Sequence, residues 1–300
     1  MTLKKFSDLE AIVKGRPAKR RILVAAAHDE HTLDGINEAF AGGMIEPVLI
    51  GDERKINGII EARSLMIGGA ETVHASDDEA CAKKAAEMAA SGYGDAIMKG
   101  KLQTADLLRE VVDKNNGLIA GDIMSHVGLF QVPTYHKLFA LTDGGMVMAP
   151  DLSQKRMILD NAVRTLHALG TDKPKVAALC ATETVNPKMR ASVDAAEMKR
   201  LNMKGEIKGC IVEGPISFDL MYDAESAKVK GYDSPVAGDA DILLMPDMTA
   251  GNLVAKSLML AAGGMMAGLI VGAKLPIVLV SRGASAEEKY WSLVFAAAVS

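Results

Sequence analysis

Short apolar runs alternate with longer stretches of helical periodicity along almost the whole chain. Short runs of β-branched and aliphatic residues are typical of buried strands, whereas apolar positions three or four residues apart are typical of helices packed on a sheet. The strands predicted in this way span residues 22–27, 47–50, 95–98, 138–142, 176–180, 208–212, 242–245 and 276–280. The predicted helices span residues 31–40, 80–90, 104–112, 153–169, 188–201, 253–260 and the last residues after 285. This alternation predicts an α/β fold with parallel sheets and right-handed crossovers.

The segment at residues 276–292 carries the most specific signal in the chain. Its apolar strand is followed directly by Ser281 and Arg282, and Ser285 then opens a helix with Glu288 at the spacing of a capping box. Open α/β sheets bind ligands at such strand ends, and the start of a helix favours an anion. Since the guanidinium of Arg282 presents a fork suited to phosphate, the sequence predicts a phosphate-handling site here.

Polar residues also follow the other predicted strands, at their carboxyl ends. They include Lys99, Gly100, Lys101, Thr104, Asp143, Glu183, Asp247, Gly251 and Asn252. Because the carboxyl ends of parallel strands meet at one edge of a sheet, we expect these groups to face one cleft. Lys99 and Lys101 are either two solvated lysines or a phosphate cradle, and the glycine between them, which permits a close backbone approach, favours the cradle.

Other polar clusters have alternative interpretations. His28 and His31 have the spacing of two metal ligands, but no further His/Cys pair accompanies them, and His28 or Asp29 is better explained as a polar group lining the cleft. Asp239 and Asp241 either bind a cation or, as we expect, lie in the turn before a strand. We therefore predict no metal site.

Length, composition and charge restrict the class of protein. The chain has 300 residues, enough for two domains of ordinary size. The net charge of −4, with both signs spread along the chain, argues against nucleic acid and membranes as partners. Cys81, Cys180 and Cys210 form no CxxC motif and are expected to be reduced thiols in or near the core. The first residues lack an apolar signal core, and the uncharged stretch 258–273 is broken by glycines, so we expect a soluble, cytoplasmic protein.

Taken together, the motifs resemble the phosphate acetyl/butyryl transferase family, and within it the phosphate butyryltransferase branch. From about residue 21 to the end, the resemblance is carried in order by RILVAAAHDEHTLDGI, IMKGKLQTADLL, LTDGGMVMAPDLSQKRMILDNAV, CATETVNPKM, GPISFDL, GDADILLMPDMTAGN and LVSRGASAEEK. It implies two α/β/α domains with an interdomain cleft, similar to isocitrate and isopropylmalate dehydrogenases. The first domain would hold residues 1–137 and 271–300, and the second residues 138–270.

The resemblance also implies a reaction: short-chain acyl-CoA (butyryl or acetyl) plus phosphate gives acyl phosphate plus CoA, reversibly, in a ternary complex. Glu288 would take the proton of the CoA thiol, with Glu287 as the alternative base; Arg282 would hold phosphate, and Ser281 would stabilise the tetrahedral oxyanion. The other polar strand-end residues would bind substrate. No cofactor is implied, since CoA is a substrate, and a homodimer is expected.

Two other functions compete with this interpretation. An NAD-dependent dehydrogenase of the same fold would need clustered arginines and metal-binding aspartates, whereas Asp239 and Asp241 are the one close aspartate pair near a strand end. A CoA-binding module without activity would bind CoA and turn nothing over. The length of the acyl chain depends on pocket walls that the sequence does not identify.

Overall fold

The computed structural model describes residues 2–121, 123–280 and 284–300. The chain divides into two compact units. The terminal unit consists of Phe6–Asp122 and Ala267–Ser300, and the middle unit of Met1–Lys5 and Ile123–Met266. The limits expected from the sequence, 137/138 and 270/271, differ from these. The first differs because residues 125–131 form a strand that pairs with β6 (Phe139–Thr142) of the middle unit.

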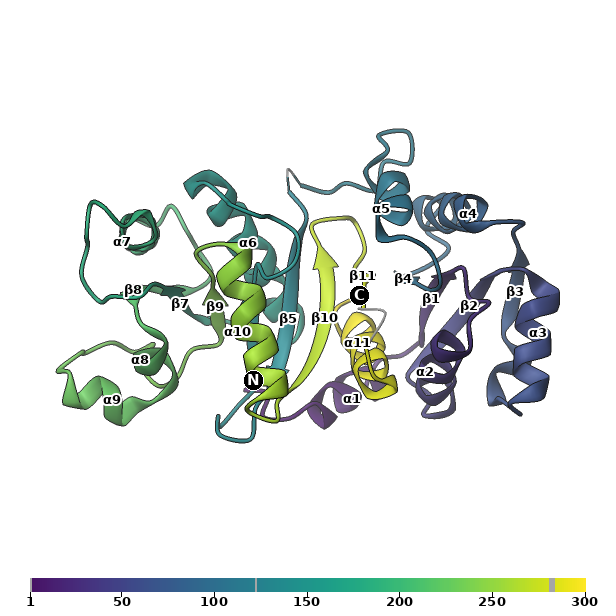
Figure 1. The fold of residues 1–300 in the computed structure, drawn as a ribbon, viewed down its shortest axis with the longest axis horizontal. Helices are drawn as coiled ribbons and strands as arrows, with labels where there is room; N and C mark the ends of the chain where they lie inside the picture. Colours follow the sequence, from purple (N-terminus) through teal and green to yellow (C-terminus); the bar gives the residue numbers. More distant parts are fainter. Residues whose placement is uncertain (1, 122, 281–283) are drawn as a thin grey trace. The chain divides into compact units, whose positions relative to one another are not determined.

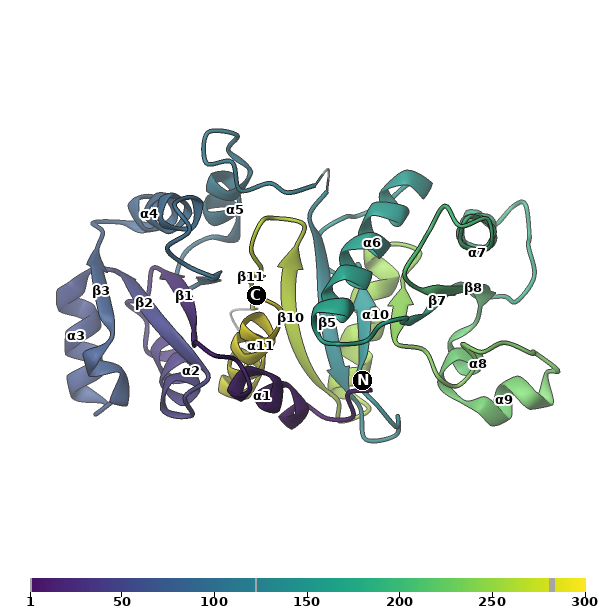
Figure 2. The same cartoon turned by 180° about the vertical axis from the view of Figure 1, so that it is seen from behind.

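The terminal unit is built on strands that run in the order β3-β2-β1-β4-β11-β10. They are β1 (Arg20–Ala25), β2 (Ile45–Gly51), β3 (Glu71–His74), β4 (Ala96–Lys99), β10 (Met265–Val271) and β11 (Ile277–Val278). Its helices are α1 (Ser7–Lys14), α2 (Glu30–Ala41), α3 (Glu53–Ala62), the 3-10 helix η1 (Met66–Gly69), α4 (Asp78–Ala90), α5 (Thr104–Val112) and α11 (Ala286–Val299). Helices α4 and α5 pack together on one side of the strands, and α2 and α11 pack together on the other (Figures 1 and 2).

The middle unit has strands in the order β5-β6-β9-β7-β8. They are β5 (Ser125–Gln131), β6 (Phe139–Thr142), β7 (Lys175–Leu179), β8 (Ile211–Ile216) and β9 (Ile242–Leu244). Its helices are α6 (Leu152–Ala168), α7 (Arg190–Met203), α8 (Phe218–Tyr222), α9 (Ala224–Val229) and α10 (Met248–Leu260). Helices α6 and α10 lie on opposite sides of β9 (Figures 1 and 2). Side chains of β5, β6, β8, α8 and α10 share one apolar core.

The α/β class predicted from the alternation is confirmed, but the all-parallel sheet is wrong. β5 runs antiparallel to β6, and β11 runs antiparallel to β10. The other described pairs, such as β1 with β2 and with β4, are parallel. The sheets are therefore mixed.

Side-chain caps explain where several helices begin. The carboxylates of Asp29, Asp52, Asp77, Asp151, Asp223 and Asp247 and the hydroxyl of Ser285 each accept a backbone N–H at a helix start. Ser153, where the predicted helix 153–169 begins, is inside α6, which Asp151 and Gln154 start with a reciprocal capping box. Likewise α10 starts at Met248, before the expected residue 253, because Asp247 caps it.

The three cysteines are protected by burial. Cys81, Cys180 and Cys210 are free and buried. Burial raises the pKa of both Cys81 and Cys210 to about 11, so these thiols stay protonated near neutrality.

Within the part of the chain that is described, no helix combines the length and the apolar composition needed to cross a membrane.

Asp239 and Asp241 join the beginnings of three strands of the middle unit. The Lys137 ammonium is 2.8 Å from Asp239 Oδ1 and 2.5 Å from Asp241 Oδ1, and its side chain is only 5% exposed. Asp239 also pairs with Lys175, the first residue of β7, and lies 3.0 Å from His136 Nε2. Both aspartates lie just before β9, as expected, and their oxygens accept from Lys137 and Lys175, including the Lys175 backbone amide on Asp241 Oδ2.

Asp239→Asn should lower the stability of the middle unit and reduce its dependence on pH. Partial burial alone raises the pKa of Asp239, but hydrogen bonds from Lys137, Lys175 and His136 outweigh it and lower the pKa from 3.8 to about 2. The depressed pKa contributes stability that is present above about pH 4 and is lost as the pH falls towards 2. Since the carboxylate is 39% exposed, solvent screening leaves roughly 1 kcal/mol at pH 7.

Urea unfolding of the full chain at neutral and at acidic pH measures this effect. The matched control is Asp172→Asn, an exposed aspartate of the same unit. Equal free energies of unfolding for the Asp239 and Asp172 variants at neutral pH would contradict the prediction.

Candidate active site

The carboxyl ends of β1 and β4 approach each other so closely that only glycine fits at position 100. The Gly100 amide donates to the Ala25 carbonyl at 2.8 Å, and the Lys101 amide donates to the Ala26 carbonyl at 2.9 Å. Ala26 adopts a left-handed conformation, with φ of 58°. A Cβ added to Gly100 would lie 2.2 Å from the Ala26 oxygen and 2.7 Å from the Ala25 oxygen. The close backbone approach expected of this glycine is therefore present.

Lys99 is the last residue of β4, and its ammonium is held inside the turn that follows. The residue is 8% exposed, and Nζ donates to the carbonyls of Gly100 and Leu102, each at 3.1 Å. Buried lysines are rare unless their charge is paired or solvated by polar groups. The turn thus solvates a fixed positive charge at the strand end.

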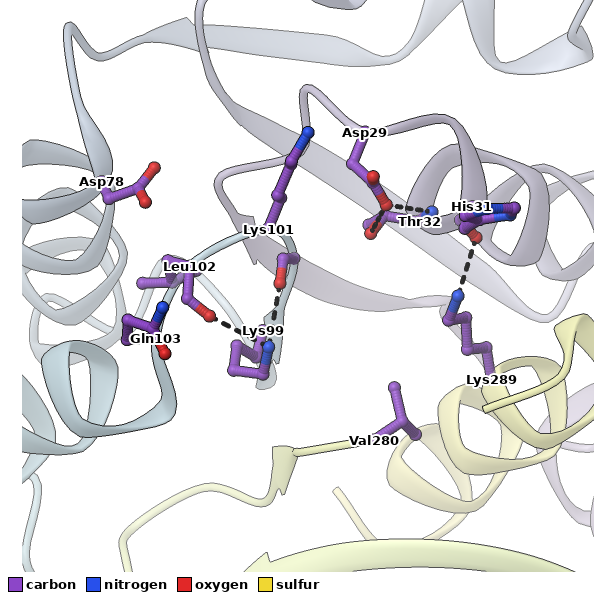
Figure 3. A pocket seen from close by; sticks show the side chains of 11 residues that line it. Asp29, His31, Thr32, Asp78, Lys99, Lys101, Leu102, Gln103, Val280 and Lys289 are labelled. Carbon is purple, nitrogen blue, oxygen red and sulfur yellow. Dashed lines mark hydrogen bonds between the residues drawn. The ribbon is translucent and has the colours of Figure 1, made fainter. Parts of the chain in front are cut away.

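A cavity of about 400 Å³ opens beside this turn. Its lining includes the lysines Lys99, Lys101 and Lys289 and the carboxylates Asp29 and Asp78. Lys99 and Lys101 enter it from the end of β4, and Lys289 enters it from α11 (Figure 3). Three ammonium groups in one small cavity favour an anionic ligand.

Asp29 serves both the helix and the cavity. Its Oδ2 accepts hydrogen bonds from the Thr32 amide at 3.0 Å and the Thr32 hydroxyl at 2.8 Å, and this caps α2. Partial burial raises its pKa, but the Thr32 hydrogen bonds and the charges of Lys101 and Lys289 outweigh this, so the pKa lies below the ordinary aspartate value. Asp29, expected as a lining residue, is therefore a carboxylate that faces the lysines.

Lys289 was missed by the sequence analysis. It lies in the first turn of α11, is 7% exposed, and donates from Nζ to the His31 carbonyl at 3.2 Å. Its signal in the sequence was a single basic residue followed by ten uncharged helical positions, YWSLVFAAAV. An isolated cation on a buried helix commonly has a partner in the fold or a ligand.

The predicted catalytic residues are only partly described. Ser281 and Arg282 lie outside the described residues. The Glu288 amide donates to the Ser285 hydroxyl at 3.0 Å, so the expected cap is present, and Glu288 is half-buried. Glu287 is exposed, and its Oε1 accepts a 3.5 Å hydrogen bond from the Trp291 indole. Neither glutamate lines the cavity.

Of the substrate-binding residues predicted in the terminal unit, Lys99, Gly100 and Lys101 line the cavity. Thr104 is exposed at the start of α5 and is not part of the lining, whereas Gln103, the residue before it, is.

In the middle unit, three predicted residues come together around the loop after β6. The Asp143 carboxylate accepts hydrogen bonds from the amides of Gly145, Met146 and Val147 at 2.7, 2.9 and 3.1 Å. A Cβ on Gly251 would lie 2.6 Å from the Asp143 carbonyl oxygen, and Asn252 Nδ2 donates to the Gly144 carbonyl at 3.4 Å. The first turns of α10 therefore pack directly against this loop.

The other two predicted residues of this unit have separate local roles. Asp247 caps α10 by accepting the Ala250 amide at 2.9 Å. Glu183 Oε1 accepts the Ser217 hydroxyl at 2.6 Å and the Lys230 ammonium at 3.0 Å. Hydrogen bonds, first that of Ser217, lower the pKa of Glu183. Among the described residues, no three His, Cys, Asp or Glu side chains are grouped so as to hold a metal ion.

Comparison with known proteins identifies the family. A family model described as phosphate acetyl/butaryl transferase matches residues 80–297. The chain is 37% identical over 298 residues to the phosphate butyryltransferase of Clostridium acetobutylicum, covering 99% of both chains. It is 38% identical over 290 residues to the phosphate acetyltransferase of Thermotoga maritima, covering 96% of this chain and 98% of that one.

A solved structure is similar over almost the same length. The branched-chain phosphotransacylase from Enterococcus faecalis V583 superposes with a TM-score of 0.83 at 32% identity, covering 93% of this chain and 98% of that chain. The resemblance seen in the sequence motifs is thus confirmed, and the chain belongs to the phosphate acetyl/butaryl transferase family.

Proposed function

We propose that this chain is a phosphate acyltransferase, which reversibly converts a short-chain acyl-CoA and phosphate into an acyl phosphate and CoA. The observation that carries the proposal, beside family membership, is the cavity lined by Lys99, Lys101 and Lys289 at the carboxyl ends of β1 and β4. Phosphate, acyl phosphate and CoA are all anionic, and ammonium groups and free backbone amides are suited to binding them.

In the direction of acyl-CoA synthesis, the CoA thiol first loses its proton to a carboxylate. The thiolate attacks the acyl carbonyl, the new C–S bond forms, the C–O bond to phosphate breaks, and phosphate leaves with the electron pair of that bond. In this proposal Glu288 accepts the proton of the CoA thiol, since it is half-buried and adjoins the buried Lys289. Glu287, in contrast, is exposed and hydrogen-bonded to Trp291.

Phosphate is held, in this proposal, by Lys99 and Lys101. Gly100 permits the close approach to β1 that places the two lysines, and its amide and that of Lys101 are hydrogen-bonded at the end of β1. Arg282 adds a bidentate contact to phosphate, and Ser281 donates to the oxyanion of the tetrahedral intermediate. The last two roles are supported by the SRG motif between a strand and a helix and by family membership. Asp143, Glu183, Asp247, Gly251 and Asn252 stay predicted substrate contacts.

The finer expectations about architecture and setting are part of the same proposal. The terminal and middle units are proposed to be two α/β/α domains of the isocitrate/isopropylmalate dehydrogenase type. The protein is proposed to be a cytoplasmic homodimer that uses CoA as a substrate and needs no cofactor. Light scattering on the purified full chain tests the dimer, and a monomer at all concentrations would contradict it.

The decisive assay follows thiol release from acetyl-CoA, propionyl-CoA and butyryl-CoA, with and without phosphate. We expect release only with phosphate, together with an acyl phosphate that hydroxylamine traps, and the ratio of kcat/KM along the series identifies the acyl group. Sulfate replaces phosphate in the control reaction. Absence of release with all three substrates would contradict the proposal.

The dehydrogenase alternative is weaker, because the relatives found over nearly the whole chain are phosphate butyryl- and acetyltransferases. It is tested in parallel by NAD reduction with 2-hydroxy acids. Binding of CoA without turnover would instead indicate the inactive CoA-binding module.

A further inference from the structure

We propose that Lys289 is a third phosphoryl-binding lysine, which contacts the phosphate group that is transferred. This inference rests on the proposed function and adds a residue to the proposed site. Lys289 comes from α11, whereas Lys99 is the last residue of β4 and Lys101 lies in the turn after it. The two sources bring positive charge to the cavity from different sides (Figure 3).

The Lys289 side chain is fixed along its length. A Cβ at Gly35, in the middle of α2, would lie 2.9 Å from Lys289 Cβ and 3.4 Å from its Cδ. The stem therefore lies in a notch that exists because position 35 carries no side chain. A stem held in this way loses little conformational entropy when its head group binds a ligand.

The ammonium head keeps donor capacity for a ligand. Nζ has three N–H donors, and its one hydrogen bond to the described residues goes to the His31 carbonyl at 3.2 Å. The residue is 7% exposed, so its side chain has lost most of its contact with bulk water. An anion that accepts one or both remaining donors would compensate for that loss.

The charges around the cavity favour a phosphoryl group as this anion. The nearby carboxylate Asp29 already binds the Thr32 amide and hydroxyl through Oδ2. Three lysines and two carboxylates line the cavity, which leaves a net positive charge before His31 is counted. Orthophosphate and acyl phosphate carry their charge on several oxygens, which several separate ammonium groups can share.

Lys289→Met removes the ammonium and keeps most of the stem. We expect the KM for phosphate, and for acyl phosphate in the reverse direction, to rise at least about tenfold, while the KM for CoA changes less than about twofold. We also expect phosphate to raise the melting temperature of the native chain and to raise that of the variant much less. Lys289→Arg retains the charge and should recover part of the phosphate affinity. Lys84→Met, an exposed lysine on α4, is the matched control and should behave as the native chain.

Three outcomes would overturn the inference. In the first, the KM for phosphate and the phosphate-induced thermal shift are unchanged in Lys289→Met. In the second, the KM for phosphate and the KM for CoA rise equally, which indicates a structural tie between α2 and α11. In the third, only the KM for CoA rises, which places Lys289 on a phosphate of CoA.

If Lys289→Met does not fold, a second variant still tests the inference. Gly35→Ala displaces the stem while the charge stays in the chain, and we expect it to raise the KM for phosphate selectively. An unchanged KM for phosphate in Gly35→Ala would count against the inference. If the native chain shows no phosphate-dependent thiol release, the proposed function fails, whereas the thermal shift with phosphate still tests Lys289 separately.

Discussion

Gly100→Ala is expected to lower kcat/KM for acyl transfer by at least two orders of magnitude. It should also lower the free energy of unfolding of the terminal unit by about 1–3 kcal/mol. The added methyl would lie 2.2 Å from the Ala26 carbonyl oxygen, and the neighbouring Ala25 oxygen is also too close, at 2.7 Å. These are backbone atoms that cannot rotate away, so the turn after β4 must move. That movement breaks the hydrogen bonds from Gly100 and Lys101 to β1 and displaces both lysines from the cavity.

Two measurements separate the effects on folding and on catalysis. Urea unfolding gives the change in the free energy of unfolding, and kcat/KM for phosphate, measured where the variant is fully folded, gives the effect on the site. Gly58→Ala is the control, because that glycine lies within α3 of the same unit and its added Cβ meets nothing within 4 Å. We expect the Gly58→Ala variant to keep full activity and its free energy of unfolding to rise by up to about 1 kcal/mol. If the Gly100→Ala enzyme keeps the native kcat/KM, the turn at Lys99, Gly100 and Lys101 is not the phosphate-binding site.

Lys99→Met is expected to lower kcat/KM for phosphate by about two to three orders of magnitude, comparable with the loss of one donor to a developing anion. Lys99 is 8% exposed and lines the cavity, so its interaction with a bound phosphate is screened less than that of a surface lysine. Its removal also leaves the Gly100 and Leu102 carbonyls without this donor, at a cost of about 1–3 kcal/mol.

The comparison variants for Lys99 change one property at a time. Lys99→Arg keeps the charge but not the compact head that the turn surrounds, so we expect activity between those of the native and methionine enzymes. Lys83→Met removes an exposed lysine of α4 and should leave activity unchanged. If folded Lys99→Met retains activity within threefold of the Lys83 control, Lys99 is a structural residue and the phosphate is bound elsewhere.

The sequence predicted those parts of the fold that depend on local pattern. The buried runs of β1, β2, β4, β6, β7 and β9 are short, apolar and partly β-branched, and each was found near its place. β5 was missed because its sequence, SHVGLFQ, mixes polar residues and glycine into the run. Its antiparallel pairing with β6 depends on a partner strand and not on its own composition.

The same distinction applies to the candidate site. The motif Lys99-Gly100-Lys101 was predicted to be a phosphate cradle because a glycine between two lysines after a strand is a signal carried by the local sequence. Lys289 was not recognised, since its burial depends on Gly35, far away in the sequence. Asp143 was expected to bind substrate, and its three backbone hydrogen bonds arise from a loop conformation that side-chain types do not specify.

The three buried cysteines have a practical consequence for all these measurements. Reagents that detect released CoA react with thiolates, whereas the protonated, enclosed sulfurs of Cys81 and Cys210 react slowly, and Cys180 is buried as well. The colour that develops in a turnover assay therefore counts coenzyme and not enzyme. Under denaturant the same reagent reports the appearance of protein sulfhydryls, so one chromophore can record both the chemistry of a variant and the integrity of its chain.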